Sequence, residues 1–187
     1  MNVVVLGRPG AGKGTQSKRI EKHFGLRHLS TGELLRAAKQ QDTPLGRQIA
    51  DRIDQGNLVT DELAMSLVEQ TIKPQPHCGY VFDGIPRTLN QGRMLSDLLA
   101  GLGTQVDLAI ELHVGQEMVR DRLLERATKE GRGDDTLQTI RQRLAVYEAQ
   151  TSPLIAFYRE AGLLRSVDGA GSPDEVFELI RRQLDAS

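Results

Sequence analysis

The chain has 187 residues and a net charge of −1, a length that suits one domain or one domain with small inserts. This charge gives no global basic field for nucleic acid or an anionic membrane. The single cysteine, Cys78, excludes an intramolecular disulfide and a multi-cysteine zinc site. No signal-peptide pattern opens the chain, and no run approaches the ~20 apolar residues of a membrane span. We therefore expect a cytoplasmic protein with neither nucleic-acid nor membrane partners.

Strand-like and helix-like segments alternate along the sequence. The apolar and β-branched runs predict strands at 2–6, 27–29, 79–83, 107–113 and 163–167. The helical periodicity predicts helices at about 13–24, 31–40, 43–54, 60–72, 88–101, 115–128, 136–158 and 173–185. This alternation favours an α/β fold in which helices cover a parallel sheet.

Two stretches interrupt the alternation. Residues 30–59 place two helices in succession and predict a small helical insert. Residues 127–135 are polar and contain two glycines, which predicts a mobile loop. Ligands of α/β sheets bind beyond the carboxyl ends of the strands. We therefore expect the loops after Leu6, Leu29 and Asp83 to share one face.

The first loop carries the most informative motif. Residues 7–15 read GRPGAGKGT after an apolar strand, and they match G-x-x-x-x-G-K at Gly7, Gly12 and Lys13. Glycines let the backbone wrap a phosphate, whose charge then faces the loop amides, a helix N-terminus and Lys13. Gly14 stands where Ser or Thr usually contacts magnesium, and Thr15 comes one residue later. The alternative interpretation is a glycine-rich turn between a strand and a helix.

The segment that begins at Ser30 has two interpretations. The S-x-x-E pattern from Ser30 to Glu33 is a helix capping box, in which case Arg36 is a solvated helix residue. The functional interpretation is that this helix start and Arg36 bind a second anionic ligand.

A third segment, VFDGIPR at 81–87, places an acid at the end of an apolar strand and an arginine four residues later. Asp83 can hold the water shell of a magnesium ion, and the planar fork of Arg87 can clamp a phosphate. The alternative is a simple Asp-Gly turn that closes the strand.

Arginines gather in the C-terminal half of the chain. They are Arg122, Arg126, Arg132, Arg141 and Arg143. Nearby acids allow a solvated helix with surface salt bridges, but arginines around a mobile loop also suit phosphoryl transfer, in which charge builds on the moving group. The four histidines show no metal-ligand spacing, and no Ser–His or Cys–His arrangement suggests a nucleophile. A phosphate acceptor needs no such activation.

Together these segments resemble adenylate kinases over nearly the whole chain. The similar segments are GRPGAGKGT (7–15), HLSTGELLR (28–36), GNLVTD (56–61), DGIPRT (83–88) with Gln91, DR at 121–122 with Arg126, GRGDD (131–135), IRQRL (140–144) and VDG (167–169). The resemblance implies an α/β P-loop three-layer fold with a central parallel five-stranded sheet. It also implies one nucleotide kinase domain over 1–187, with an AMP-binding insert at 30–59 and a short lid at 126–136.

The same resemblance implies roles for individual residues. The catalytic set is Lys13, Asp83, Arg87, Arg126, Arg132 and Arg143, with Asp83 acting through magnesium-bound water. ATP would contact Gly10, Ala11, Gly12, Lys13, Gly14, Thr15, Arg122, Arg126 and Gly169. AMP would contact Thr31, Arg36, Asn57, Leu58, Val59, Gly84, Arg87, Gln91, Arg132 and Arg143. Asp134 and Asp135 would orient the closed lid.

Smaller features of the sequence bear on the identity of the acceptor base and on zinc. Related pyrimidine monophosphate kinases tend to carry alanine at the position of Thr31 and asparagines near Thr88 and Gln91, so this chain resembles the AMP type. Three residues depart from the usual family pattern, namely Glu33, Asn57 and Ile85, and Ile85 could alter packing around the AMP base. The short lid and single cysteine leave no place for zinc.

The resulting hypothesis is a monomeric cytoplasmic enzyme that converts ATP–Mg and AMP to two ADP. Two alternatives remain open. One is a kinase for another nucleoside monophosphate, and the other is a P-loop regulator that binds one nucleotide and switches a partner. The absence of an N-K-x-D element argues against a GTPase switch.

Overall fold

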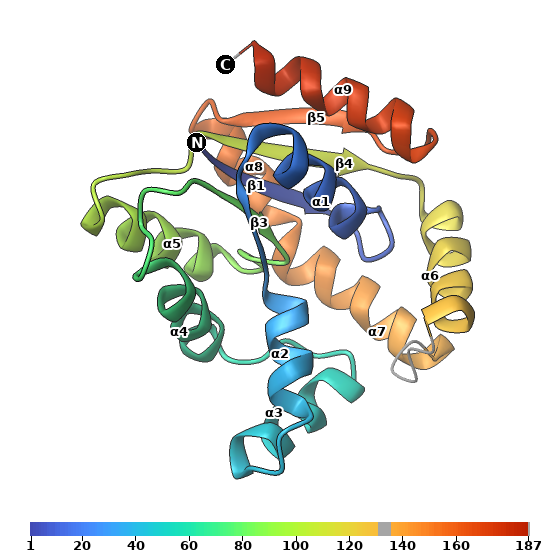
Figure 1. Ribbon diagram of the computed structural model, residues 1–187. Helices are drawn as coiled ribbons and strands as arrows, with labels where there is room; N and C mark the ends of the chain where they lie inside the picture. Colours follow the sequence, from blue (N-terminus) through green and yellow to red (C-terminus); the bar gives the residue numbers. More distant parts are fainter. Residues whose placement is uncertain (131–135, 187) are drawn as a thin grey trace.

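The computed structural model describes residues 1–130 and 136–186, with the backbone alone for 126–130. Its centre is a five-stranded sheet in the order β2-β3-β1-β4-β5, with every neighbouring pair parallel (Figure 1). The strands are β1 (Asn2–Gly7), β2 (Arg27–Ser30), β3 (Tyr80–Asp83), β4 (Leu108–His113) and β5 (Leu164–Asp168). The predicted parallel α/β fold is confirmed, and each strand lies within one residue of its predicted bounds.

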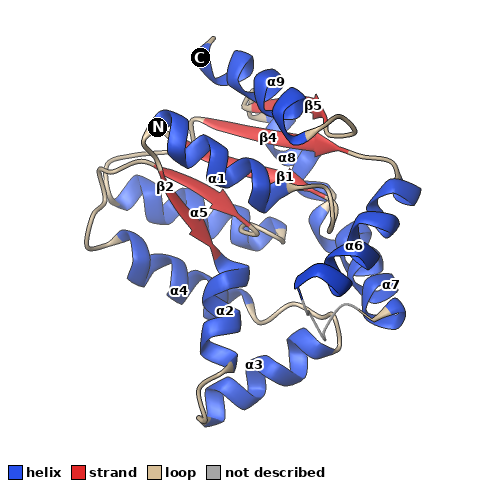
Figure 2. Cartoon of the chain, turned by 45° about the vertical axis from the view of Figure 1, so that its right-hand side comes forward, coloured by secondary structure: helices blue, strands red, loops and turns tan. Residues whose placement is uncertain are grey.

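Helices connect successive strands and cover the sheet. They are α1 (Lys13–Phe24), α2 (Thr31–Lys39), α3 (Pro44–Asp54), α4 (Asp61–Ile72), α5 (Leu89–Gly101), α6 (Gln116–Glu130), α7 (Leu137–Val146), α8 (Pro153–Glu160) and α9 (Pro173–Asp185). Figures 1 and 2 show α1 and α9 on one face of the sheet and α5 on the other, with α2 and α3 projecting together from one end. The predicted succession of two helices within 30–59 is therefore present.

The strand β1 shows why the sheet lies between two helical layers. All six of its residues are buried, as expected for a parallel strand covered on both faces. Side chains alternate along a strand, so Val4 and Leu6 enter the core beneath α4, α5 and α8, whereas Val3 and Val5 enter the core beneath α1 and α9. Two separate hydrophobic cores thus hold one central sheet.

Two predictions about helix boundaries are wrong. The segment 136–158 is not one helix, because a π-helical turn at Tyr147–Thr151 separates α7 from α8. The predicted loop at 127–135 also starts too early, since α6 continues to Glu130. Residues 131–135 lie outside the described part of the chain. Among the described helices, none is long and apolar enough to cross a membrane.

Two neighbouring residues of α9 offer a test of the second core. Ile180 is fully buried there, while Leu179 is 40% exposed. We expect Ile180→Ala to lower the free energy of unfolding by about 2–5 kcal/mol, because it removes buried methyl groups and leaves a cavity. Leu179→Ala is the matched control and should cost less than about 1 kcal/mol. Urea denaturation measures both, and equal losses would contradict this packing.

Candidate active site

One large cavity lies at the carboxyl ends of the strands. Its volume is about 640 Å³, within the usual size range of ligand pockets. The segments that follow β1, β2 and β3 contribute to its wall, so the expectation that they share one face is confirmed, although after β2 the segment is the start of α2 and not a loop. The middle of α6, the end of α7, the π-helical turn and the loop after β5 contribute as well. The cavity therefore collects residues from almost the whole length of the chain.

The predicted site residues can be placed individually. Those in the cavity wall are Gly10, Ala11, Gly12, Lys13, Gly14, Thr15, Thr31, Arg36, Asn57, Leu58, Val59, Asp83, Gly84, Arg87, Gln91, Arg122, Arg143 and Gly169. The side chain of Arg126 and the whole of Arg132, Asp134 and Asp135 lie outside the described residues. Their predicted roles therefore stay predictions.

The phosphate-loop motif forms a tight turn between β1 and α1. The Ala11 amide donates to the Arg8 carbonyl oxygen over 3.0 Å, and Gly12 caps α1. Gly10 has a φ of +87°, and a Cβ there would lie 2.9 Å from the Val119 carbonyl oxygen, so glycine is required on two grounds. The N-terminus of α1 thus faces the cavity, with its partial positive charge available to an anion.

Lys13 is already positioned inside this loop. Its ammonium group donates to the carbonyl oxygens of Gly7, at 2.7 Å, and Arg8, at 3.0 Å. These bonds hold the charge on the cavity side of the loop. A phosphate bound at the loop amides would find Lys13 adjacent to it.

The segment after β2 forms the predicted capping box only in part. Ser30 accepts a hydrogen bond from the Glu33 amide over 3.4 Å and so caps α2. The carboxylate of Glu33 instead lies 3.3 Å from the ammonium of Lys18. Arg36 lines the cavity from the same helix. A helix cap and a cavity-lining arginine therefore coexist here.

Arg87 lies among other positive charges. Burial lowers the pKa of its guanidinium, Asp83 raises it, and Arg143 and Arg36 lower it further. An arginine nevertheless stays protonated at neutral pH. Its Nε donates to the Gly84 carbonyl oxygen over 2.8 Å, an oxygen that also accepts from Thr31 over 2.8 Å. Three guanidiniums thus share one cavity wall, an arrangement that favours an anionic ligand.

Asp83 remains a carboxylate within this wall. Burial alone would raise its pKa, but a hydrogen bond from His28 and the positive charges of Lys13, His28 and Arg87 lower it overall. His28 Nε2 lies 3.4 Å from Asp83 Oδ2, and the two side chains are only 6% and 13% exposed. A carboxylate accepts only, so the imidazole must be the donor.

Sequence reasoning missed several contributors to this site. The sequence predicted no role for His28 itself, since the histidines lack metal-ligand spacing, and its contact with Asp83 spans 55 residues of sequence. Thr151 donates to the Arg87 carbonyl oxygen over 2.8 Å, and Arg8 pairs with Glu148 at 2.8 Å. Residue spacing does not reveal these contacts. His28 meets Asp83 through the pairing of β2 with β3, and Glu148 and Thr151 reach Arg8 and Arg87 only when the helical segment after α6 returns to the cavity.

The parallel sheet and its glycine loop place the chain in the class of P-loop proteins. A family model described as adenylate kinase matches residues 5–163. A protein named adenylate kinase from Maricaulis maris is 49% identical over 177 residues, which cover 94% of each chain. An adenylate kinase from Thermus thermophilus is 42% identical over 182 residues, or 97% of this chain and 96% of that protein. The chain belongs to the adenylate kinase family and is a phosphotransferase of the nucleoside monophosphate kinase class.

The contact between His28 and Asp83 leads to a pH prediction. We expect His28→Leu to raise the pKa of Asp83, because the hydrogen bond that favours the carboxylate is lost. In the native protein the folded pKa is below the ordinary 3.8, so the stability that Asp83 contributes is present above about pH 4 and is lost as pH falls through the folded pKa.

As pH falls, the stability that the Asp83 carboxylate contributes should be lost at a higher pH in His28→Leu than in the native protein. Carboxyl carbon shifts measured by NMR during an acid titration report the pKa directly. His28→Gln, which keeps a donor but not the charge, is the matched control and should keep the pKa of Asp83 below that in His28→Leu. Identical titration curves in all three proteins would rule out this role for His28.

Proposed function

We propose that this protein is an adenylate kinase, which transfers the terminal phosphoryl group of magnesium-bound ATP reversibly to AMP and gives two ADP. The observation that carries the proposal is the gathering of Lys13, Arg36, Arg87 and Arg143 in one cavity beside a phosphate loop. Positive charge on both sides of the cavity suits two phosphate-bearing ligands that meet between them. The names of the relatives support the same reaction.

ATP would bind on the side of the phosphate loop. The amides of Gly10, Gly12, Gly14 and Thr15 and the ammonium of Lys13 would hold its phosphates, and Ala11 would contribute to the same loop. Arg122 donates to the Gly169 carbonyl oxygen over 3.0 Å and joins α6 to the loop after β5. That junction would form the wall beside the ATP base.

AMP would bind on the side of α2. Arg36 and Arg87 would hold its phosphate, and Gln91 would contact its base. Thr31, Gly84 and the segment 57–59 would complete this half of the cavity, since all of them lie in its wall. Residues 30–59 would then act as the AMP-binding unit of the single domain.

The residues present also fit a magnesium ion held through water. Asp83 faces the cavity as a carboxylate, and a Cβ at Gly14 would lie only 3.3 Å from its Oδ2, so glycine keeps this oxygen accessible. Magnesium usually keeps several waters and binds one or two carboxylates plus substrate phosphates. When bound, the ion would neutralise phosphate charge. Among the described residues, no cluster of three or more His, Cys, Asp or Glu could hold a metal ion directly.

Catalysis would depend on positioning and charge. The acceptor oxygen of AMP is already anionic near neutral pH, so no base is needed to activate it. Arg87 and Arg143 would stabilise the charge on the phosphoryl group in flight, and Arg126 and Arg132 would join them from a short lid oriented by Asp134 and Asp135. Because one chain supplies both halves of the cavity, we infer a monomer, acting in cytoplasmic nucleotide homeostasis without zinc.

The first test measures ADP formation from ATP–Mg with AMP, CMP, UMP or GMP offered separately. We expect strong activity with AMP alone. Activity with another acceptor would keep the chemistry and overturn the base assignment. If no acceptor supports activity, equilibrium dialysis should count bound nucleotides, because a kinase binds two and a single-nucleotide switch binds one.

Lys13 provides the sharpest test of the loop. We expect Lys13→Met to lower kcat by roughly 10²- to 10³-fold, the usual loss when one charge-stabilising donor is removed. Lys22→Met, an exposed change on the same helix, is the matched control and should leave kcat unchanged. Circular dichroism verifies folding, and a folded Lys13→Met enzyme with full activity would exclude this role.

A further inference from the structure

The side-chain amide of Gln91 is held at both of its ends. Gln91 is only 2% exposed yet contributes to the cavity wall. Its Nε2 donates to Asp61 Oδ1 over 2.8 Å, and its Oε1 accepts from the backbone amide of Arg87 over 2.7 Å. The amide therefore has two polar partners that come from different parts of the chain.

These two partners allow only one orientation of the amide. A carboxylate can only accept, and a backbone N–H can only donate. A flipped amide would set its oxygen against Asp61 and its N–H group against the amide of Arg87, so two bonds would become two repulsions. The assignment of nitrogen and oxygen in Gln91 thus follows from the chemistry of its neighbours.

Asp61 is itself fixed in place. It is the first residue of α4, and Thr88 Oγ1 donates to it over 3.0 Å while Asn90 Nδ2 donates over 2.9 Å. Thr88 also caps α5, because its Oγ1 accepts a hydrogen bond from the backbone N–H of Gln91. Gln91 lines the cavity and Asp61 does not, so Asp61 bonds to Gln91 from outside the cavity wall.

The orientation of Gln91 decides what it can recognise. A side-chain amide has two N–H donors and two acceptor lone pairs. Asp61 and the backbone of Arg87 each use one, so one N–H donor and one acceptor lone pair remain for a ligand. Adenine offers an amino donor beside a ring-nitrogen acceptor, which matches this pair. A 6-oxopurine such as hypoxanthine or guanine offers a carbonyl acceptor beside an N–H donor and would need the flipped amide.

We propose that Asp61 is a positioning residue that locks the Gln91 amide and makes the acceptor site reject 6-oxopurine nucleoside monophosphates. The inference rests on the proposed function, in which Gln91 faces the acceptor base. It adds a residue outside the cavity as a determinant of acceptor specificity. The selectivity arises from a cost imposed on the wrong ligand, because a mismatched base leaves buried polar groups unpaired.

The test compares AMP with IMP as acceptors, since these two differ at the edge in question. In Asp61→Asn we expect the ratio of kcat/KM for AMP to that for IMP to fall by roughly 10- to 100-fold, the range for losing one hydrogen bond to a charged group. KM for AMP should rise, while KM for ATP stays within about twofold, because the donor side is untouched.

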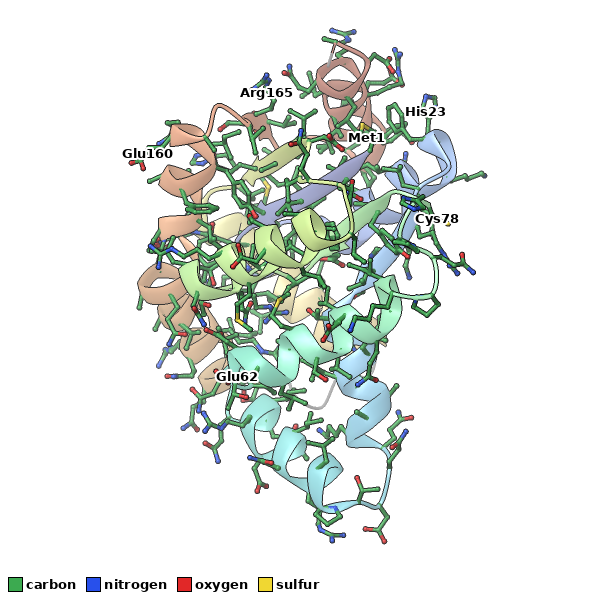
Figure 3. All side chains as sticks on the ribbon, turned by 90° about the vertical axis from the view of Figure 1, so that its left-hand side faces the viewer. Met1, His23, Glu62, Cys78, Glu160 and Arg165 are labelled. Carbon is green, nitrogen blue, oxygen red and sulfur yellow. The ribbon has the colours of Figure 1, made fainter. Side chains whose placement is uncertain are left out.

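Glu62→Gln is the matched control. Glu62 follows Asp61 in the first turn of α4 and is exposed at the surface of that helix (Figure 3). The change removes the same charge from the same helix end without touching Gln91. We expect it to leave the ratio of AMP to IMP unchanged. An equal fall in both variants would show a general charge effect and overturn the inference.

A double-mutant cycle separates positioning from general loosening. In a Gln91→Leu background there is no amide to orient, so adding Asp61→Asn should not change the ratio further. A further fall would contradict the proposed pathway through Gln91. If Asp61→Asn does not fold, Asp61→Ser carries the same test, because its hydroxyl can both donate and accept.

The outcomes distinguish the two proposals. A native enzyme that prefers AMP, together with an Asp61→Asn enzyme of unchanged ratio, overturns the positioning role and leaves the adenylate kinase reaction intact. A native enzyme that uses IMP as well as AMP also overturns it. A native enzyme with no activity on any acceptor overturns the proposed function itself.

Discussion

The buried charge of Arg87, which shares the cavity wall with Arg36 and Arg143, is the constraint on which the cavity depends. Burial is the largest cost to the charge of Arg87, and the guanidiniums of Arg143 and Arg36 add to that cost. The surrounding structure offsets this with fixed partners: the Asp83 carboxylate, and the Gly84 carbonyl oxygen that accepts from Arg87 Nε. Stability that the two hydrophobic cores supply is thus used to hold like charges together. Such a wall is electrostatically complementary to phosphate before any ligand arrives, which is the preorganisation that phosphoryl transfer requires.

Much of the fold could be predicted because its signals are local. The continuous apolar run of β1 indicates burial on both faces, and the strand ends then bring separate loops to one edge of the sheet. The π-helical turn at Tyr147–Thr151 could not be predicted in this way. Apolar periodicity gives an average of 3.6 residues per turn, and one wider turn inside a long helical segment hardly alters that average. The continuation of α6 to Glu130 was missed because polar residues and glycine were taken as the beginning of a loop.

The residues of the candidate site also fall into two groups, those that local sequence marks and those that only the packed structure brings together. Residues inside sequence motifs, such as Lys13 and Arg87, are found in the cavity wall because a motif marks the loop and the strand fixes its position. For the residues that orient them, the sequence predicted no role, although His28 and Asp61 lie within segments that resemble the family. His28 reaches Asp83 across 55 residues, and Asp61 reaches Gln91 across 30. Their partners are set by how α4 meets α5 and how β2 pairs with β3, which depends on the packed structure.

The π-helical turn connects the two sides of the cavity. At one end Glu148 pairs with Arg8 of the phosphate loop at 2.8 Å, and Arg8 also lies over the ring of Tyr147 at 6.0 Å. At the other end Thr151 donates to the Arg87 carbonyl oxygen over 2.8 Å. A single turn therefore contacts both the loop that would hold the donor and the arginine that would hold the acceptor. A π-helical turn presents successive side chains at angles that a regular α-helix does not. Because an error of about 1 Å between reacting groups can cost roughly 10²-fold in rate, one shared support limits the relative movement that matters most for transfer.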